Sequence, residues 1–404
     1  MMAVAGVNTF LSGSPLSMRI NPAHAPEGKT IVSVFQRGGC DGLNCVIPYN
    51  EGHYYDMRPT IAIGAPDAPT NAALDLNGQF DLHPALSGLH QLYQAGSLAI
   101  LPTVHDPNGS RSHFQSQHYI ESGQRQSVSD GWLNRHLQTQ NSNASFRAVG
   151  FGSNLAQSLR SDETVASLTR LANYNIGLDN EEETLLLQRL SPLYQQSASS
   201  ANQSLLNRFG LRVFNDLDLI GQIRSQDYQP ENGAQYPNNN FGNQLREVAQ
   251  LIKSGVGLEA ATVDIGGWDT HSNQGTANGS QARSLTAFSQ GIHAFVTDLA
   301  DYMQDVVLLT STEFSRPAHE NGSRGTDHGY ASTWFAIGGG IQGGLFGDWP
   351  GLSQNQLRDG RYLDATVDYR DIYAEILTHH LTHNQLASLL PDFTPQTLNL
   401  FANS

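Results

Sequence analysis

The feature that most constrains the fold is an alternation of short apolar runs with longer segments of helical periodicity. The runs are rich in β-branched residues and too short for helices, so they predict buried strands. Strands are expected at 30–35, 98–104, 148–150, 259–265, 305–310 and 333–337. Helices are expected at 84–96, from about 113 to 122, and at 182–226, 241–254, about 283–304 and 371–380. This alternation predicts an α/β fold with a mainly parallel sheet flanked by helices.

The chain shows no internal repeat and no clear linker, so residues 29–404 are expected to form one domain. The helical stretch of about 155–255 is interpreted as an insertion or cap. Residues 1–28 lack the pattern of a folded element and are expected to be a leader or a disordered arm. Within them, Ala23-His24-Ala25 has the small-x-small form of a signal-peptidase site, although no basic segment precedes it. This form predicts export, and a disordered terminus is the alternative.

Charge and cysteine content exclude several classes of protein. The net charge is −15, and only Lys29 and Lys253 are lysines, which argues against binding to the phosphate backbone of nucleic acids. No run of 18 apolar residues exists, so no mature membrane span is expected. The two cysteines, Cys40 and Cys45, are too few for a disulfide scaffold or a Cys-rich zinc module. A disulfide between them is possible after export but would strain the short loop.

Acidic and histidine side chains gather at the ends of the predicted strands. They are Asp41, Asp269, His271, Glu313, Asp327 and His328. Because ligands bind at one edge of an open α/β sheet, these side chains are expected to converge there. Taken alone, an Asp in a loop is more often a cap or a turn former, and a single His is more often a hydrogen-bonded surface group. Together they predict a site for one or two divalent ions, zinc first, with Ca, Mg or Mn as alternatives. Asp327 has a second interpretation, since it could orient His328 instead of binding metal.

The start of the helix near residue 113 supplies the catalytic candidates. Ser110 and Ser112 follow a buried strand and a Pro-Asn-Gly turn. A helix N-terminus favours a bound anion, so a serine there is either a nucleophile or an N-cap. The planar guanidinium of Arg111 suits a phosphate or sulfate group, and a structural salt bridge is its alternative role. His113 and His118 are weaker candidates.

Seven motifs, in this order, resemble the bacterial domain-of-unknown-function 1501 family. They are Phe35-Gln-Arg-Gly-Gly-Cys-Asp-Gly-Leu-Asn44, Leu82-His-Pro-Ala-Leu86, Ser110-Arg-Ser-His-Phe114, Gly266-Gly-Trp-Asp-Thr-His271, Thr312-Glu-Phe-Ser-Arg316, Gly325-Thr-Asp-His-Gly329 and Asp368-Tyr-Arg370. The resemblance runs from about Lys29 to the C-terminus. That family looks like a branch of the alkaline phosphatase and sulfatase superfamily. Its members are generally exported to the periplasm or beyond, often by the twin-arginine route.

The resemblance also implies roles for individual residues. The superfamily's metal ligands match Asp41, Asp269, His271, Glu313 and His328. The usual spacing of four residues between the second and third ligands is shortened to two here, between Asp269 and His271. The His that normally adjoins the third acidic ligand is Phe314 here, which weakens a second zinc site. Ser315 stands where this family more usually shows Gly.

The nucleophile of the superfamily opens the helix after the second strand, about ten residues before a Ser/Thr-Gly pair. The pair here is Ser122-Gly123, which places the expected position of the nucleophile, called the nucleophile slot below, near His113. Ser112 carries the hydroxyl nearest to that position. No Cys or Ser lies in a sequence context of the sulfatase signature form, so the resemblance does not imply formylglycine chemistry.

The resemblance therefore implies an exported, metal-dependent hydrolase of phosphate or sulfate esters with Ser112 as nucleophile and Arg111 as anion clamp. Its substrate would be a small anionic ester or a sulfated or phosphorylated saccharide. The alternative is a non-catalytic exported protein that keeps the fold and binds a metal or a ligand. A serine esterase is disfavoured because the sequence has no Gly-x-Ser-x-Gly elbow.

Overall fold

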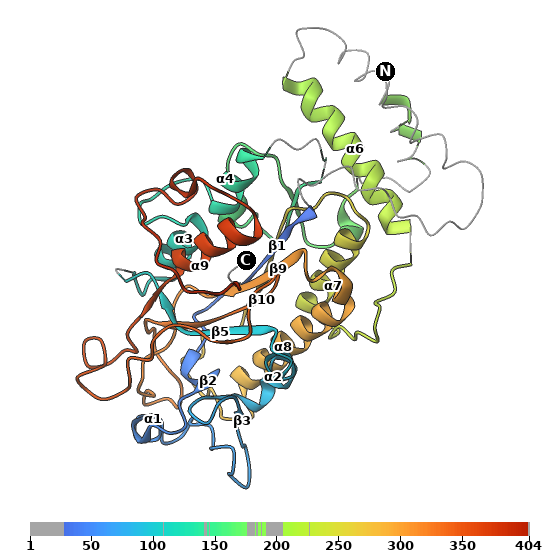
Figure 1. Cartoon of the computed structure of the whole chain (residues 1–404). Helices are drawn as coiled ribbons and strands as arrows, with labels where there is room; N and C mark the ends of the chain where they lie inside the picture. The colour runs from blue at the N-terminus through green and yellow to red at the C-terminus, as the bar shows by residue number, and fades with distance from the viewer. Residues whose placement is uncertain are drawn as a thin grey trace.

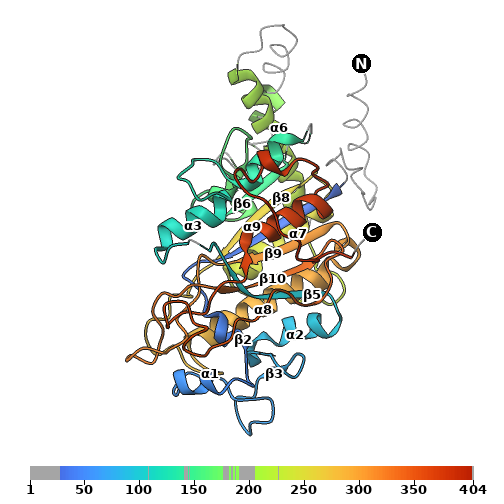
Figure 2. The same ribbon diagram turned by 60° about the vertical axis from the view of Figure 1, so that its left-hand side comes forward.

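The main sheet runs through the whole molecule (Figures 1 and 2). The computed structural model describes residues 28–402, apart from 108, 141–143, 145, 176–181, 183–184, 187, 191–204 and 226. In this described part, nine strands form the sheet in the order β11-β5-β10-β9-β1-β8-β6-β7, with β12 paired to β5. Their bounds are β1 Thr30–Gln36, β5 Leu98–His105, β6 Ala148–Phe151, β7 Ala166–Leu168, β8 Ala260–Ile265, β9 Val306–Ser311, β10 Ser332–Gly338, β11 Gly344–Leu345 and β12 Val367–Asp368.

Strand direction decides which loops meet at each edge of the sheet. β1 is parallel to β8 and β9, and β8 is parallel to β6. β10 is antiparallel to both β9 and β5, so β5 runs in the direction of β1. The segments that follow β1, β5, β8 and β9 therefore share one edge with the segment that precedes β10; we call it the carboxyl edge. The predicted α/β class with a mainly parallel sheet is confirmed, and the six predicted strands are present with their ends within one residue.

Helices cover both faces of the sheet (Figure 1). One face carries α2 (Ser87–Gln94), α7 (Asn240–Lys253) and α8 (Ser280–Asp298), and the other carries α3 (His113–Ser122), α4 (Trp132–Thr139) and α9 (Tyr369–Glu375), which a π-turn extends over Ile376–His380. Along β1 the side chains alternate between the faces, as the pleat of a strand requires. Val32 and Val34 join the first apolar cluster, and Ile31 and Phe35 join the second.

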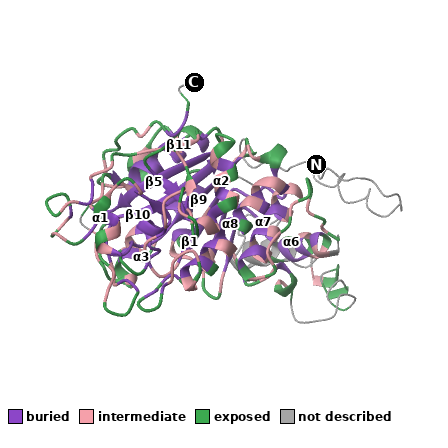
Figure 3. Ribbon diagram, turned by 90° about the horizontal axis from the view of Figure 1, so that it is seen from below, coloured by how far each residue is buried: buried purple, intermediate pink, exposed green. Residues whose placement is uncertain are grey.

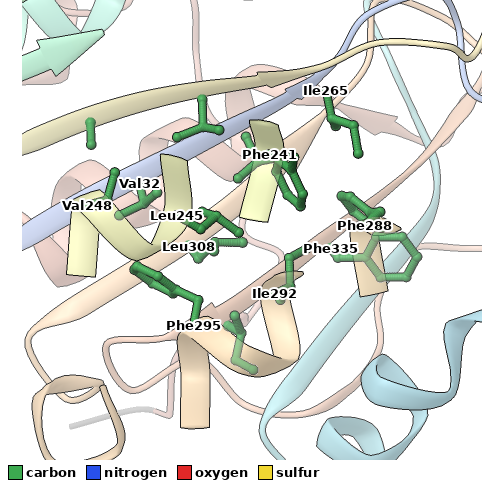
Figure 4. Close-up of a cluster of buried hydrophobic side chains, with 14 of the residues drawn as sticks. Val32, Phe241, Leu245, Val248, Ile265, Phe288, Ile292, Phe295, Leu308 and Phe335 are labelled. Atoms are coloured by element: carbon green, nitrogen blue, oxygen red, sulfur yellow. The ribbon is translucent and has the colours of Figure 1, made fainter. Parts of the chain in front are cut away.

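Burial is greatest in the strands and on the inner faces of the helices (Figure 3). Figure 4 shows the first cluster, in which side chains of α7 and α8 pack on the sheet. The labelled members are Val32, Phe241, Leu245, Val248, Ile265, Phe288, Ile292, Phe295, Leu308 and Phe335. The inner faces of α7 and α8, which correspond to the helices expected at 241–254 and about 283–304, thus form one side of the core.

Smaller elements surround this core. A second sheet has the order β2-β4-β3, formed by Val46–Ile47, Asp81–Leu82 and Leu74–Asp75, and lies beside α1 (Gly52–Met57). α6 (Leu205–Ser225) extends away from the sheet (Figures 1 and 2). None of the helices among the described residues is both long and apolar enough to cross a bilayer.

The segment 155–255, which we interpreted as an insertion, contributes β7 to the sheet and α7 to a helix layer. The expected helix of 182–226 is seen as α6, and much of its first half lies outside the described residues. The division into one domain with an insertion stays a prediction, as does the leader, since residues 1–27 also lie outside the described part.

Asp81 of β4 makes the stability of the fold dependent on pH. Its side chain is 0% exposed, and neither carboxylate oxygen has a hydrogen-bond partner among the described residues. Burial, with a contribution from Asp75, raises the pKa of Asp81 to about 7 from 3.8. The folded state therefore holds a proton that the unfolded state releases, so stability is lost as the pH rises from about 4 to about 7.

We expect Asp81→Asn to raise the free energy of unfolding by about 2–4 kcal/mol at pH 8 and to have little effect at pH 4. Urea unfolding of both proteins at pH 4, 6 and 8 measures this difference. A difference between the two proteins that is the same at all three pH values would contradict the assignment.

Candidate metal centre

Three histidine side chains meet at the carboxyl edge of the sheet. His113 is the first residue of α3, His271 follows β8 and His328 precedes β10. The Nε2 atom of His328 lies 3.1 Å from Nε2 of His113 and 3.1 Å from Nε2 of His271. Asp269 joins them, with Oδ1 3.0 Å from His271 Nε2 and 3.4 Å from His328 Nε2. We call these four residues the histidine cluster; each is at least partly exposed, so solutes can reach it.

The second ring nitrogen of each histidine faces an oxygen acceptor. The contacts of Nδ1 are His113 with Glu313 Oε1 at 2.7 Å, His328 with the Arg111 carbonyl at 3.0 Å, and His271 with Asp327 Oδ1 at 3.6 Å. For His113 and His328 these hydrogen bonds assign the ring proton of the neutral imidazole to Nδ1, whereas the nearer acceptor of His271 is Asp269 Oδ1, beside its Nε2. The Nε2 lone pairs of His113 and His328 then face each other at 3.1 Å, and a cation between them would remove their repulsion. Histidines held in this way are typical of metal ligands.

The spacing of the cluster fits a metal ion. Zn–N bonds of about 2.0–2.1 Å in a tetrahedral site place neighbouring ligand atoms about 3.3 Å apart. The two Nε2–Nε2 distances of 3.1 Å are close to this value. The ligand atoms that all lie within 4.8 Å of one another belong to His113, Asp269 and His328, and His271 adjoins this group through His328 and Asp269. Imidazole nitrogens and a carboxylate are ligand types that bind divalent transition-metal ions.

Glu313 lies behind His113 and orients it. The Glu313 side chain is fully buried, and its Oε1 also accepts hydrogen bonds from the Gly38 N–H and from Gln117 Nε2, both at 2.9 Å. Burial alone would raise the pKa of Glu313, but the hydrogen bonds from His113 and Gln117 bring it below its ordinary value. The hydrogen bond to Glu313 in turn raises the pKa of His113. The ligand role expected of Glu313 from the sequence stays a prediction, and in the structure its Oε1 contacts His113 Nδ1.

Asp269 is fixed by Arg316, a residue that sequence reasoning did not single out. Arg316 is fully buried, and its Nη2 donates to Asp269 Oδ1 at 2.7 Å and to the Trp268 carbonyl at 2.9 Å. Burial would raise the pKa of Asp269, but the Arg316 hydrogen bond and charge, with the nearby His271 and His113, lower it. The carboxylate is therefore charged near neutral pH. The one sequence feature that could have indicated a role for Arg316 was its position in the motif Thr312–Arg316.

Asp327 lies at the rim of the cluster beside His271. It accepts hydrogen bonds from Asn321 Nδ2 at 3.1 Å and from Arg361 Nη2 at 3.0 Å. These bonds, that of Asn321 first, lower its pKa. The alternative role for Asp327 was to orient His328, but the Arg111 carbonyl fills that place and Asp327 faces His271 instead.

Asp41 has contacts of a different kind from those predicted. Its carboxylate is buried and receives two hydrogen bonds from Arg58, at 2.7 and 3.0 Å, and a third from Gln274 Nε2 at 2.6 Å. Both oxygens are thus engaged by an arginine and an amide. The motif match made Asp41 a metal ligand, but its contacts are those of a buried ion pair beside the histidine cluster.

The predicted nucleophile, Ser112, and the predicted anion clamp, Arg111, directly precede His113 in the chain. Ser112 is the N-cap residue of α3, yet its exposed side chain makes no capping hydrogen bond, and its backbone N–H donates to Ser110 Oγ at 3.0 Å. The Arg111 guanidinium donates to the Tyr362 hydroxyl and lies 4.6 Å from the centroid of that ring. His113, a weaker candidate in the sequence, occupies the slot assigned to the nucleophile. The roles of Ser112 and Arg111 stay predictions.

Phe314 closes the inner side of the cluster. It is fully buried, and its ring centroid lies 4.8 Å from that of His113 and 4.9 Å from that of His328. A phenyl ring offers no ligand atom. The number of ions, one or two, stays a prediction.

The family comparison agrees with the motif order. The family described as "Protein of unknown function (DUF1501)" matches residues 28–390. The chain belongs to this family. No curated protein shows significant sequence similarity to it.

Several solved structures resemble the DUF1501 chain at low identity. The structure of Ps i-CgsB in complex with k-i-k-neocarrahexaose shares 8% identity, with a TM-score of 0.41, over 92% of this chain and 75% of that one. The alkaline phosphatase from the Antarctic bacterium TAB5 shares 9% identity, with a TM-score of 0.34, over 88% of this chain and 99% of that one. An alkaline phosphatase superfamily protein from Vibrio parahaemolyticus shares 11% identity, with a TM-score of 0.31, over 90% and 72%.

The two cysteines of the DUF1501 chain lie beside Asp41. Cys40 and Cys45 are free and buried, with their sulfur atoms 3.4 Å apart. Burial, reinforced by Cys45, raises the pKa of Cys40, so its thiol is a poor nucleophile at neutral pH.

Proposed function

We propose that the DUF1501 chain is an exported, metal-dependent hydrolase of phosphate or sulfate esters, in a branch of the alkaline phosphatase and sulfatase superfamily. The observation that carries the proposal is the group of His113, Asp269 and His328 at the carboxyl edge, with His271 beside His328 and Asp269. These residues would hold a divalent ion, which would supply Lewis-acid chemistry toward an ester group. Zinc fits the ligand atoms best.

Basic groups beside the cluster suit an anionic substrate. Arg111 and Arg361 are both exposed, whereas Arg316 is fully engaged below the cluster. The first turn of α3 adds backbone N–H groups and the positive end of the helix dipole. We assign the binding of the phosphate or sulfate oxygens to these groups, although Arg111 also donates to the Tyr362 hydroxyl and Arg361 to Asp327.

Ser112 is our proposed nucleophile, and replacing it with alanine tests this role. Its hydroxyl is exposed, is not used in capping and belongs to the residue next to His113. We expect Ser112→Ala to lower the turnover of p-nitrophenyl phosphate or p-nitrophenyl sulfate by at least about 10³-fold, because no other group replaces the attacking oxygen. Stopped assays at saturating substrate, with zinc content measured on the same sample, give the result.

Ser110→Ala is the matched control, since Ser110 lies two residues away on the same loop and is expected to lose less than about tenfold. Full turnover by Ser112→Ala, with Ser110→Ala inactive, would transfer the role to Ser110.

A non-catalytic metal-binding protein is the second candidate. Phe314 and the presence of His113 in the nucleophile slot favour it, because both replace groups that the superfamily uses for chemistry. Zinc analysis of the purified protein, followed by aryl phosphate and aryl sulfate turnover with and without chelator, separates the two. Stoichiometric zinc without turnover supports the second candidate.

Export rests on the sequence. The proposed cleavage near Ala25 lies outside the described residues, and we propose a periplasmic or secreted location.

A further inference from the structure

An open pocket of about 360 Å³ lies beside the histidine cluster. One wall is a single face of α3, formed by Phe114, Gln117, His118 and Glu121, which follow the i, i+3, i+4, i+7 pattern. The opposite wall is the segment 153–157 with Arg160. Arg37, at the end of β1, and Asp264 of β8 also line the pocket. We call this the α3 pocket.

The α3 pocket adjoins the proposed metal centre through Gln117. This side chain lines the pocket and donates at 2.9 Å to Glu313 Oε1, the atom that holds His113. Phe114 follows His113 directly in the chain. The part of a substrate that extends from an ester group at the cluster can therefore reach into the pocket.

The walls of the pocket are joined by hydrogen bonds. His118 Nδ1 and Gln157 Oε1 are 3.0 Å apart, and Gln157 Nε2 donates to the Val128 carbonyl at 2.9 Å. These bonds connect α3 to the short helix Gln157–Leu159. The pocket is thus formed before any ligand arrives, which favours binding because fewer groups must be ordered.

The charges of the lining compensate one another. Arg37 binds Glu121 through two hydrogen bonds, at 2.9 and 3.0 Å, and lies 3.1 Å from Asp264. With Arg160, the lining has two cations and two carboxyl groups. Among the other lining residues, Ser153, Asn154, Gln117 and Gln157 are uncharged and offer donors and acceptors, and Leu155 and Ala156 are apolar. Such a lining suits a neutral ligand with many hydroxyl groups.

Phe114 adds an apolar surface to this polar pocket. Its side chain is 90% exposed, more than any other large hydrophobic side chain among the described residues. An exposed aromatic ring leaves its flat face free for the C–H face of a sugar ring, while amides and hydroxyls bind the sugar hydroxyls. The geometry assigns the α3 pocket to the saccharide portion of the substrate. Only the position of the ester group at the histidine cluster rests on the proposed function; the binding of sugar in the pocket does not.

The test is direct binding of neutral sugars to protein stripped of metal. Maltose, lactose and cellobiose are titrated into the full chain and followed by saturation-transfer NMR and calorimetry. We expect at least one to bind with a millimolar dissociation constant. Phe114→Ala and Asn154→Ala should each weaken binding by about fivefold or more, and Phe114→Tyr should retain it.

Tyr302→Ala is the matched control, because Tyr302 is another exposed aromatic residue but precedes β9 and so lies at the opposite edge of the sheet. It should leave sugar binding unchanged. The proposal is overturned if none of the three disaccharides binds at a sugar concentration of about 20 mM, which corresponds to the weakest affinity of interest. It is also overturned if Phe114→Ala binds the sugars as the wild type does. Since no metal or turnover is involved, sugar binding that needs Phe114 in a protein without esterase activity would retain the pocket and reject the hydrolase.

Discussion

Replacing His113 with alanine is expected to reduce the zinc affinity of the protein by at least about 100-fold. The change removes one of three converging Nε2 atoms, the one 3.1 Å from His328 Nε2. It also leaves the buried Glu313 carboxylate without its histidine partner. Competition titration against a chromogenic chelator measures the affinity, and elemental analysis of the purified protein measures the stoichiometry.

Two further variants make this result specific. His118→Ala removes another histidine from α3, one that bonds to Gln157 rather than to the cluster, and zinc binding should not change. Glu313→Gln keeps the three Nε2 atoms but weakens the contact that orients His113, so an intermediate loss of about 10–100-fold is expected. If His113→Ala binds zinc as tightly as the wild type, the ion does not occupy the histidine cluster.

The strands were predictable because a buried strand leaves a continuous apolar run in the sequence. Their directions were not. Asp327 and His328 precede β10, and in a parallel strand they would lie at the opposite edge from Asp269. β10 is antiparallel to both of its neighbours, which brings His328 within 3.4 Å of Asp269. Direction depends on how distant segments pair, and no local pattern in the sequence reports it.

The candidate site shows a second limit of sequence reasoning. Ligands and the residues that orient them are of the same chemical types, so Glu313 and Asp327 had the same signal as Asp269. His113 had a weak signal because the start of a helix does not reveal where a side chain points. Asp41 had a strong signal, a Gly-rich turn after a strand, but its partner Arg58 is 17 residues away and carries no recognisable pattern.

The Asp41–Arg58 ion pair leads to the second large effect, on stability. Both side chains are 0% exposed, and Arg58 also donates to the carbonyls of Ala318 at 2.9 Å and Pro317 at 2.7 Å. We expect Arg58→Met to lower the free energy of unfolding by about 3–5 kcal/mol, because it leaves a buried carboxylate without its opposite charge and two carbonyls without the Arg58 donor. Chemical denaturation of the metal-free protein measures the loss.

Removing the charge of Asp41 as well separates the two roles open to that residue. In Asp41→Asn/Arg58→Met no uncompensated charge remains, so the double variant should recover at least about 1 kcal/mol of the stability lost in Arg58→Met. Asp41→Asn alone should lose stability yet bind zinc as the wild type does, because the Asp41 carboxylate is already occupied by Arg58 and Gln274. If folded Asp41→Asn instead loses its zinc, Asp41 is a metal ligand as the motif match implies, and Arg58 must release it when the ion binds.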